Sequence, residues 1–317
     1  MNSFRPKHNT QMASFDKGLA RHVLHHKQAA FAMSNRNTKP YLEALPYTSI
    51  LILIVGIPIA TLLTISFWET DGLQLYPNFT LENYKEIFTS KLTLILYLQT
   101  IKYTVLTLAF SLVIGFTCSY FLVFFVKSLK IQIALFLLCT IPFWTSTTIR
   151  MISWVPFLGK EGIFNTAAQG VGLIDQPLAF LLFSDFAVVL TYVHLFTLFM
   201  IVPIFNSMSK ISPSVIEAAK DAGASDFDVL INIIIPLTKT GIALGSIFVV
   251  ALVMGDFFVV RVMSGGQSAS VVSAMKNDID QLYYPQAAAM AVLLIAVVLA
   301  FVYLIMRVVD IRAELER

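Results

Sequence analysis

The sequence has little charge and almost no cysteine. Asp, Glu, Lys and Arg make up 13% of the 317 residues, whereas soluble domains carry about 25%. So little charge cannot solvate the surface of a soluble enzyme or a disordered chain, and a net charge of +3 is too small to indicate nucleic acid as a partner. The two cysteines, Cys118 and Cys139, lie in apolar runs, which excludes a disulfide framework and a cysteine metal cluster.

Nucleotide-binding and hydrolytic motifs are also missing. The chain has no G-x-x-x-x-G-K-[ST] loop and no H-E-x-x-H helix. Residues 266–270 (GQSAS) come nearest to a G-x-S-x-G elbow, but they lack the last glycine and a nearby histidine. The HVLHH stretch at residues 22–26 has no obvious further ligand, which favours a basic, solvated tail over a metal site. We therefore expect a chain that is not an enzyme, with no catalytic residues, no metal site and no cofactor of its own.

Apolar residues, in contrast, are abundant. They make up 57% of the chain, and the mean hydropathy is +0.77. A membrane-crossing helix needs about 20 apolar residues, and six stretches qualify. The sequence predicts an all-α, polytopic membrane protein with transmembrane helices over residues 45–68, 100–126, 131–148, 186–208, 241–263 and 287–309.

The basic residues predict the orientation of these spans. Residues 1–44 form a basic tail, and residues 209–240 form a long loop between the fourth and fifth spans. With the N-terminus in the cytoplasm, fifteen of the 22 Lys and Arg residues fall on the cytoplasmic side. We therefore expect both termini to be cytoplasmic, with the tail able to contact anionic membrane lipid.

The loop over residues 209–240 has clear helix signals. Ser212 followed by Pro213 predicts a helix start, and Gly223 predicts a stop just after Ala222. A second helix is expected over residues 225–235, ending at Pro236. The apolar side of the first helix consists of Val215, Ile216, Ala219 and Ala222, and its polar side of Glu217, Lys220 and Asp221. Such an amphipathic helix fits equally well in the groove of a partner protein or on the membrane surface.

The spacing in this loop resembles a known motif. Glu217-Ala218-Ala219, three residues, Gly223, nine residues and then Ile233-x-Ile235-Pro236 is similar to the EAA loop of ABC importer permeases, E-A-A-x3-G-x9-I-x-L-P. Ile235 in place of Leu is the single departure.

The resemblance covers about residues 45–312 and points to the type I, spermidine/putrescine-type permeases. The stretches that carry it are FTLENY (79–84), IPFWTSTTIR (141–150), GKEGIFN (159–165), GLIDQPL (172–178), IIIPLTKTGI (233–242) and VMSGG (262–266). The tail lies outside the match.

The resemblance implies a subunit of a larger importer in a bacterial inner membrane. A second homologous permease would complete the pathway, two ATP-binding subunits would use ATP and Mg, and a periplasmic binding protein would deliver the solute. The first loop helix would dock into an ATPase subunit and couple its closure to the opening of the spans. The residues implied in this coupling are Glu217, Ala218, Ala219, Asp221, Gly223 and Pro236.

Asp256 is the sharpest candidate for contact with solute. A carboxylate inside a predicted span is costly in lipid and often functional, and it would favour a cationic solute such as a polyamine. The structural alternative is a pair with Arg261 or a contact with the backbone.

Weaker candidates lie in the predicted third and fourth spans. His194 lies near the middle of the fourth span, where a hydrogen-bonded packing role is favoured over solute contact. Aromatic rings can hold an ammonium group, although an aromatic belt facing lipid is an equal alternative. The further solute-pathway candidates are Phe143, Trp144, Thr145 and Tyr192.

Two other classes of function compete with the importer. An ion-coupled secondary transporter would explain the spans, Asp256 and His194, but would leave the EAA loop unexplained. A membrane enzyme or a scaffold is disfavoured by the missing catalytic residues. Among solutes, a polyamine is expected first, while opines, amino-acid derivatives and betaine-like solutes stay open.

Overall fold

The computed structural model describes residues 43–72 and 74–309. Nearly all of the predicted basic tail, including its histidines, lies outside the described residues. The chain divides between Thr61 and Leu62 into two units. The described part of the first unit is helical, with a π-helical turn, η1 (Ile52–Gly56), followed by the start of α2 (Ile57–Ile65).

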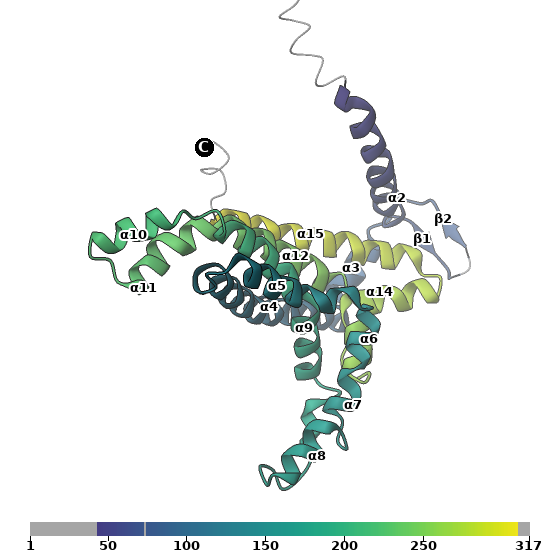
Figure 1. Ribbon diagram of the computed structural model, residues 1–317. Coiled ribbons are helices and arrows are strands. Elements are labelled where there is room, and N and C mark those ends of the chain that lie inside the picture. Colours follow the sequence, from purple (N-terminus) through teal and green to yellow (C-terminus); the bar gives the residue numbers. More distant parts are fainter. Residues whose placement is uncertain (1–42, 73, 310–317) are drawn as a thin grey trace, which may run out of the picture. The chain divides into compact units, whose positions relative to one another are not determined.

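The second unit holds the remaining elements, most of which are helical (Figure 1). A small antiparallel hairpin, β1 with β2, pairs Glu69 with Tyr76 and Thr70 with Leu75. In chain order the elements are β1 (Glu69–Thr70), β2 (Leu75–Tyr76), α3 (Glu82–Thr89), α4 (Lys91–Tyr120), η2 (Phe121–Phe125), α5 (Leu129–Thr140), η3 (Ile141–Trp144), α6 (Thr147–Ile152), α7 (Trp154–Leu158), α8 (Ile163–Gly170), η4 (Ala179–Leu181), α9 (Asp185–Met208), α10 (Pro213–Asp221), α11 (Asp226–Val229), η5 (Leu230–Ile234), α12 (Ile235–Met254), α13 (Phe258–Met263), α14 (Val271–Asp280) and α15 (Tyr284–Val309).

The helices confirm the predicted all-α membrane fold. Among the described residues, five helical stretches are long and apolar enough to cross a membrane. A sixth span results if the bent pair around α5 and α6 is counted as one. The five stretches are Glu43–Ile65, Lys91–Phe125, Asp185–Met208, Asp226–Met254 and Tyr284–Val309.

The predicted third span, residues 131–148, is not one straight helix. Helix α5 ends at Thr140, a short 3-10 turn carries Pro142, and the helical segment that follows is bent by 92°. Proline lacks an N–H and crowds the preceding turn. The helix therefore ends here, although the predicted span continues to residue 148.

The predicted fifth span, residues 241–263, has different ends. Its helix stops at Met254, and after a break at residues 255–257 the separate helix α13 runs to Met263. In the other direction, α11, η5 and α12 form one helix of 29 residues, Asp226–Met254. The expectation that the second loop helix ends at Pro236 is therefore wrong.

A π-helical turn explains how the helix continues past this proline. The turn η5 lies directly before Pro236, and η1 lies in the same way before Pro58. The wider turn relieves the clash between a proline ring and the preceding turn of helix. Hydropathy and proline position alone do not reveal such a turn.

Helices α4, α9 and α12 form the centre of the second unit, and they approach closely at Met200. A Cβ added to Gly115 of α4 would lie 2.6 Å from Met200 Cγ, and one added to Gly245 of α12 would lie 2.7 Å from Met200 Sδ. A Cβ on Gly241 would lie 2.5 Å from the carbonyl oxygen of Pro203. Small residues at a Gly-xxx-Gly spacing allow helices to approach this closely.

Candidate functional site

The loop between α9 and α12 begins with α10, which starts at Pro213 as predicted. Ser212 occupies the N-cap position, but its side chain makes no capping hydrogen bond. Instead, its hydroxyl lies 2.7 Å from the hydroxyl of Ser214. The start of α10 therefore rests on the fixed φ of proline at the first helical position.

Helix α10 ends at a glycine that the backbone requires. Gly223 has a φ of +91°, in the left-handed region that favours glycine. Its N–H donates to the Lys220 carbonyl at 2.9 Å, and the Ala224 N–H donates to the Ala219 carbonyl at 3.0 Å. This pair of bonds is a Schellman motif, and it confirms Gly223 as the helix stop.

Only part of the predicted apolar side of α10 is covered. Ile216 and Ala219 pack against the hydrophobic core, whereas Val215 is 43% exposed and Ala222 is also exposed. None of the nine residues of α10 is fully buried. Glu217, Ala218, Asp221 and Gly223 are exposed, and so is Pro236 farther along the loop. Five of the six candidate coupling residues are therefore accessible, whereas Ala219 packs inward.

Contacts between side chains fix the turn from α10 into α11. Lys220 Nζ lies 2.7 Å from Asp226 Oδ1, and this hydrogen bond raises the pKa of the Lys220 ammonium. Ser225 and Asp228 form a capping box: the Asp228 N–H donates to Ser225 Oγ, and the Ser225 N–H donates to the Asp228 carboxylate. Asp226 and Asp228 are functional candidates beyond those predicted from the sequence, although a serine three residues before an acidic residue signals this cap.

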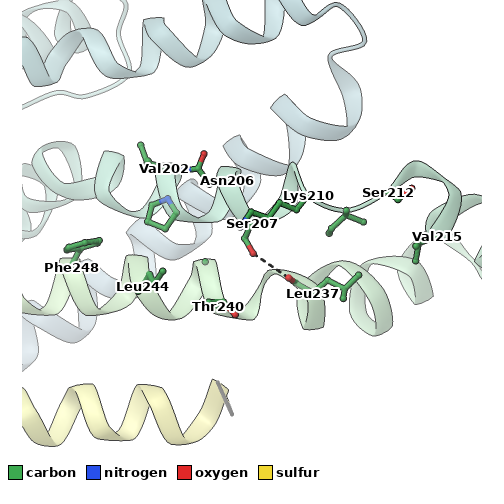
Figure 2. A pocket seen from close by; sticks show the side chains of 13 residues that line it. Val202, Asn206, Ser207, Lys210, Ser212, Val215, Leu237, Thr240, Leu244 and Phe248 are labelled. Atoms are coloured by element: carbon green, nitrogen blue, oxygen red, sulfur yellow. Dashed lines mark hydrogen bonds between the residues drawn. The ribbon is translucent and has the colours of Figure 1, made fainter. Parts of the chain in front are cut away.

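A hollow of about 680 Å³ lies where this loop joins the long helices (Figure 2). Lys210, Asn206 and Thr240 bring polar atoms to it, and the Ser207 hydroxyl donates to the Leu237 carbonyl at 3.4 Å. The rest of its lining is largely apolar and includes Val202, Pro203, Ile211, Val215, Leu244 and Phe248. The start of α10 therefore borders open space on this side.

Asp256 lies in the break between α12 and α13. Its Oδ1 accepts the Tyr192 hydroxyl at 3.1 Å and the Val259 N–H at 2.9 Å. The backbone contact weighed in the sequence analysis is thus present, while no salt bridge joins Asp256 to Arg261. A carboxylate held by a tyrosine and a helix start can still accept hydrogen bonds from a cation.

Two other solute-pathway candidates, His194 and Phe143, lie apart from Asp256. The Trp154 indole N–H donates to His194 Nδ1 at 2.9 Å, as expected of a packing histidine. His194 and Phe143 line a hollow of about 280 Å³. Residues 192 and 194 are about 200° apart around a helix, so this hollow lies on a different side of α9 from Asp256 and Tyr192.

Trp144 and Thr145 do not join either group. Trp144 is 84% exposed, which suits an aromatic belt, and the Thr145 hydroxyl donates to the Pro142 carbonyl at 2.7 Å. Among the described residues, no group of three or more His, Cys, Asp or Glu side chains could hold a metal ion.

Comparison with curated proteins finds relatives over most of the chain. It is 31% identical over 231 residues to the spermidine/putrescine transport system permease protein PotB of Haemophilus influenzae, covering 72% of this chain and 79% of the relative. PotB of Escherichia coli is 31% identical over 71% of the chain and 81% of its own length. The inner membrane ABC transporter permease protein YdcU of Escherichia coli is 27% identical over 76% of the chain and 82% of its own length. No protein-family model matches the chain.

Solved structures share the fold at lower identity. A chain of a bacterial alginate ABC transporter, in complex with an alginate pentasaccharide-bound periplasmic protein, superposes with a TM-score of 0.67 at 16% identity. The match covers 86% of this chain and 95% of that one. A second structure of a bacterial alginate importer has a TM-score of 0.67 at 17% identity, covering 87% and 96% of the two chains.

Proposed function

This chain belongs to the PotB family of ABC transporter permeases, and from that premise we propose that it forms half of the pathway of an ATP-driven importer for a polyamine-type cation. A second, homologous permease forms the other half, and two ATPase subunits hydrolyse ATP with Mg. A periplasmic binding protein delivers the solute. The permease itself binds no cofactor.

The exposed surface of α10 is the observation that supports an ATPase subunit as partner. Glu217 and Ala218 are exposed and the helix stop is fixed by Gly223, while the inner side of α10 packs through Ile216 and Ala219. A nine-residue helix is marginal in water by itself, so an exposed face with a fixed end suits docking into a preformed cleft. In this role Glu217 bonds groups of the cleft, and Ala218 allows close approach.

This proposal also sets the orientation. The α10 surface faces the cytoplasm, where ATP is available, and both termini are on that side. The segment that carries α6, α7 and α8 then faces the periplasm and the binding protein. The protein lies in the bacterial inner membrane.

Site-specific crosslinking tests the docking surface. A photoreactive amino acid at Ala222, on the exposed side of the α10 end, is expected to capture a P-loop ATPase subunit in cells. The matched control is Ala167 on α8, another exposed alanine near a helix end. A crosslink to the ATPase from Ala167, or none from Ala222, would contradict the proposed docking surface.

The Asp256 carboxylate supports a cationic solute, and a neutral isostere tests it. Asp256→Asn keeps an oxygen for the Tyr192 hydroxyl and the Val259 N–H but removes the charge. We expect putrescine uptake in cells to fall at least about tenfold, since loss of a charged hydrogen bond costs roughly 1.5–3 kcal/mol.

Asp71 provides the matched control for this variant. Its carboxylate accepts the Gln74 N–H at 2.7 Å and the Tyr76 hydroxyl at 2.9 Å. Like Asp256, it therefore accepts from one backbone N–H and one tyrosine hydroxyl. Asp71→Asn should therefore leave uptake unchanged. Normal putrescine uptake by Asp256→Asn, at equal amounts in the membrane, would remove Asp256 from the solute path.

A further inference from the structure

A second carboxylate lies at the start of α9, in a cluster that joins three parts of the chain. Asp185 Oδ2 lies 2.7 Å from Lys102 Nζ of α4, and its Oδ1 accepts from the Tyr103 hydroxyl and from Gln99 Nε2. Ser268, after α13, lies 2.8 Å from the Tyr103 hydroxyl and 2.9 Å from Gln99 Nε2. None of these polar contacts is visible in the sequence, because their members are 82 to 169 residues apart.

This cluster borders a hollow of about 630 Å³. Gln99, Asp185, Ser264 and Ser268 line it with polar atoms, and Leu92, Ile95 and Leu96 give it an apolar side. Its size falls within the range of small-ligand pockets, about 300–1,000 Å³. An apolar wall beside hydroxyl and carboxylate groups matches a ligand with methylene groups and an ammonium.

The contacts leave room for another donor at Asp185. A carboxylate can accept about four hydrogen bonds, and three donors contact this one. The Asp185 side chain is 49% exposed and that of Lys102 is 41% exposed. A flexible lysine at such a position can leave the carboxylate and enter water at little cost.

The cluster is also connected to Asp256. Asp185 and Tyr192 are seven residues apart on α9, about two turns or 10 Å. The Tyr103 ring contacts the Tyr192 ring edge-on at 6.5 Å between centroids, and Tyr192 donates to Asp256. Both rings are buried, so packed side chains, rather than an open channel, connect the two carboxylates.

We propose that Asp185 is a binding site for an ammonium group of the transported cation, and that Lys102 Nζ occupies this site until the solute displaces it. The proposal rests on the proposed function, since it concerns the same cationic solute. Exchange of one ammonium for another keeps the half-exposed Asp185 carboxylate paired throughout. Lys102 is then a built-in competitor.

An ordinary structural ion pair makes the opposite prediction for one variant. If the Lys102–Asp185 ion pair only holds α4 against α9, then Lys102→Gln and Asp185→Asn should both lower the stability of the protein, and neither should tighten solute binding. If Lys102 competes with solute, Lys102→Gln should tighten binding while Asp185→Asn weakens it. The sign of the Lys102→Gln effect therefore separates the two roles.

The experiment measures equilibrium binding of radiolabelled putrescine to the assembled transporter in nanodiscs, without the binding protein. We expect Lys102→Gln to lower the Kd about twofold to fivefold, as loss of an exposed ion pair implies. Asp185→Asn should raise the Kd at least about tenfold. Lys102→Arg keeps a cation and should leave the Kd within about twofold of wild type.

The pair between Lys276 and Asp280 on α14 is the matched control. Its side chains are 40% and 54% exposed, close to the values of Lys102 and Asp185, but neither residue lines the hollow. Lys276→Gln and Asp280→Asn should leave putrescine binding unchanged.

Three outcomes would overturn the ammonium site. They are an unchanged or raised Kd in Lys102→Gln, an unchanged Kd in Asp185→Asn, and no saturable putrescine binding by a wild-type transporter that imports putrescine. Complete absence of putrescine uptake by the wild-type system would instead count against the proposed function. Recovery of the intact complex on size-exclusion chromatography shows that each variant has folded.

Discussion

Two short helices, one before α9 and one after it, end in the same way but are held differently. Helix α10 stops at Gly223, and α8 stops at Gly172, which has a φ of +73°. At α8 the Gly172 N–H donates to the Gln169 carbonyl and the Leu173 N–H to the Ala168 carbonyl, the same Schellman pattern. In Figure 1, α8 lies at the bottom and α10 at the left.

The difference lies in what surrounds each helix. Asn165 of α8 is fully buried, and its side chain donates to the Gly159 carbonyl at 2.9 Å and accepts the Leu178 N–H at 2.8 Å. The α8 segment is thus fixed by its own chain. Helix α10 has no buried residue, and among the described residues the Glu217 carboxylate has no hydrogen-bond or ion-pair partner. The α8 segment is therefore held by hydrogen bonds within the chain, whereas the exposed surface of α10 is available to a partner, as the proposed docking requires.

The largest expected effect comes from placing the same substitution at the two glycines. An added Cβ meets nothing within 4 Å at Gly223 or at Gly172, so only backbone strain, roughly 1–2 kcal/mol, arises in either place. Gly223→Asp should abolish uptake because it also puts a charge on the docking surface, while the chain still inserts. Gly172→Asp should keep most of the uptake. Equal losses in cells with equal membrane levels would show that strain alone matters, and would contradict the coupling role.

A second change breaks the self-sufficient segment. Asn165→Ala leaves the partly buried Leu178 N–H without its acceptor, and a buried group of this kind costs about 1–3 kcal/mol. We expect faster proteolysis between residues 159 and 178 and a lower melting temperature of the purified transporter. Glu217→Gln is the counterpart on α10: it should leave the melting temperature unchanged and lower only the solute-stimulated ATPase rate. An equal fall in melting temperature in both variants would contradict the claim that Asn165 stabilises the fold and Glu217 does not.

The smallest expected effect concerns the tie between α10 and α11. Lys220→Gln removes the ion pair with Asp226, whose side chains are 52% and 85% exposed. Exposed pairs contribute little, so the coupled ATPase rate should change by less than about twofold. Because the pair raises the pKa of Lys220, its contribution is present at neutral pH and is lost only as the pH rises above the ordinary range of lysine.

Lys85 is the control for that variant. It pairs with Glu82 on α3, with side chains 68% and 69% exposed, far from α10 in the sequence. Lys85→Gln should not change the ATPase rate at all. A severe defect in Lys220→Gln would mean that the α10–α11 turn depends on this pair rather than on Gly223 and the capping box.

The sequence predicted those helix ends that depend on residues close together in the chain. The start of α10 at Pro213 and its stop at Gly223 follow from residue type and spacing, and the structure confirms them. The ends of the third and fifth spans did not follow, because hydropathy does not register the turn at Pro142 or the break after Met254.

Contacts between distant residues set the other limit on prediction. Tyr192 and Asp256 were each singled out, but their hydrogen bond depends on how α9 packs beside the end of α12. Asp185 was not singled out, because a charge at the edge of an apolar run is ordinary at the start of a span. Its importance appears only when Lys102, Tyr103 and Ser268 are found around it.

The unbroken helix from Asp226 to Met254 has a mechanical consequence. At 1.5 Å per residue its 29 residues extend about 43 Å, and the contacts of Gly241 and Gly245 with α9 lie near its middle. A rigid tilt of about 10° around that contact would move each end by about 3–5 Å, in opposite directions. The Asp226 end would follow α10, and the Met254 end would displace the backbone next to Asp256. If the helix ended at Pro236, a displacement of α10 would be taken up by the residues at that break. Because the π-helical turn continues the helix past this proline, the displacement is transmitted from one end of the helix to the other.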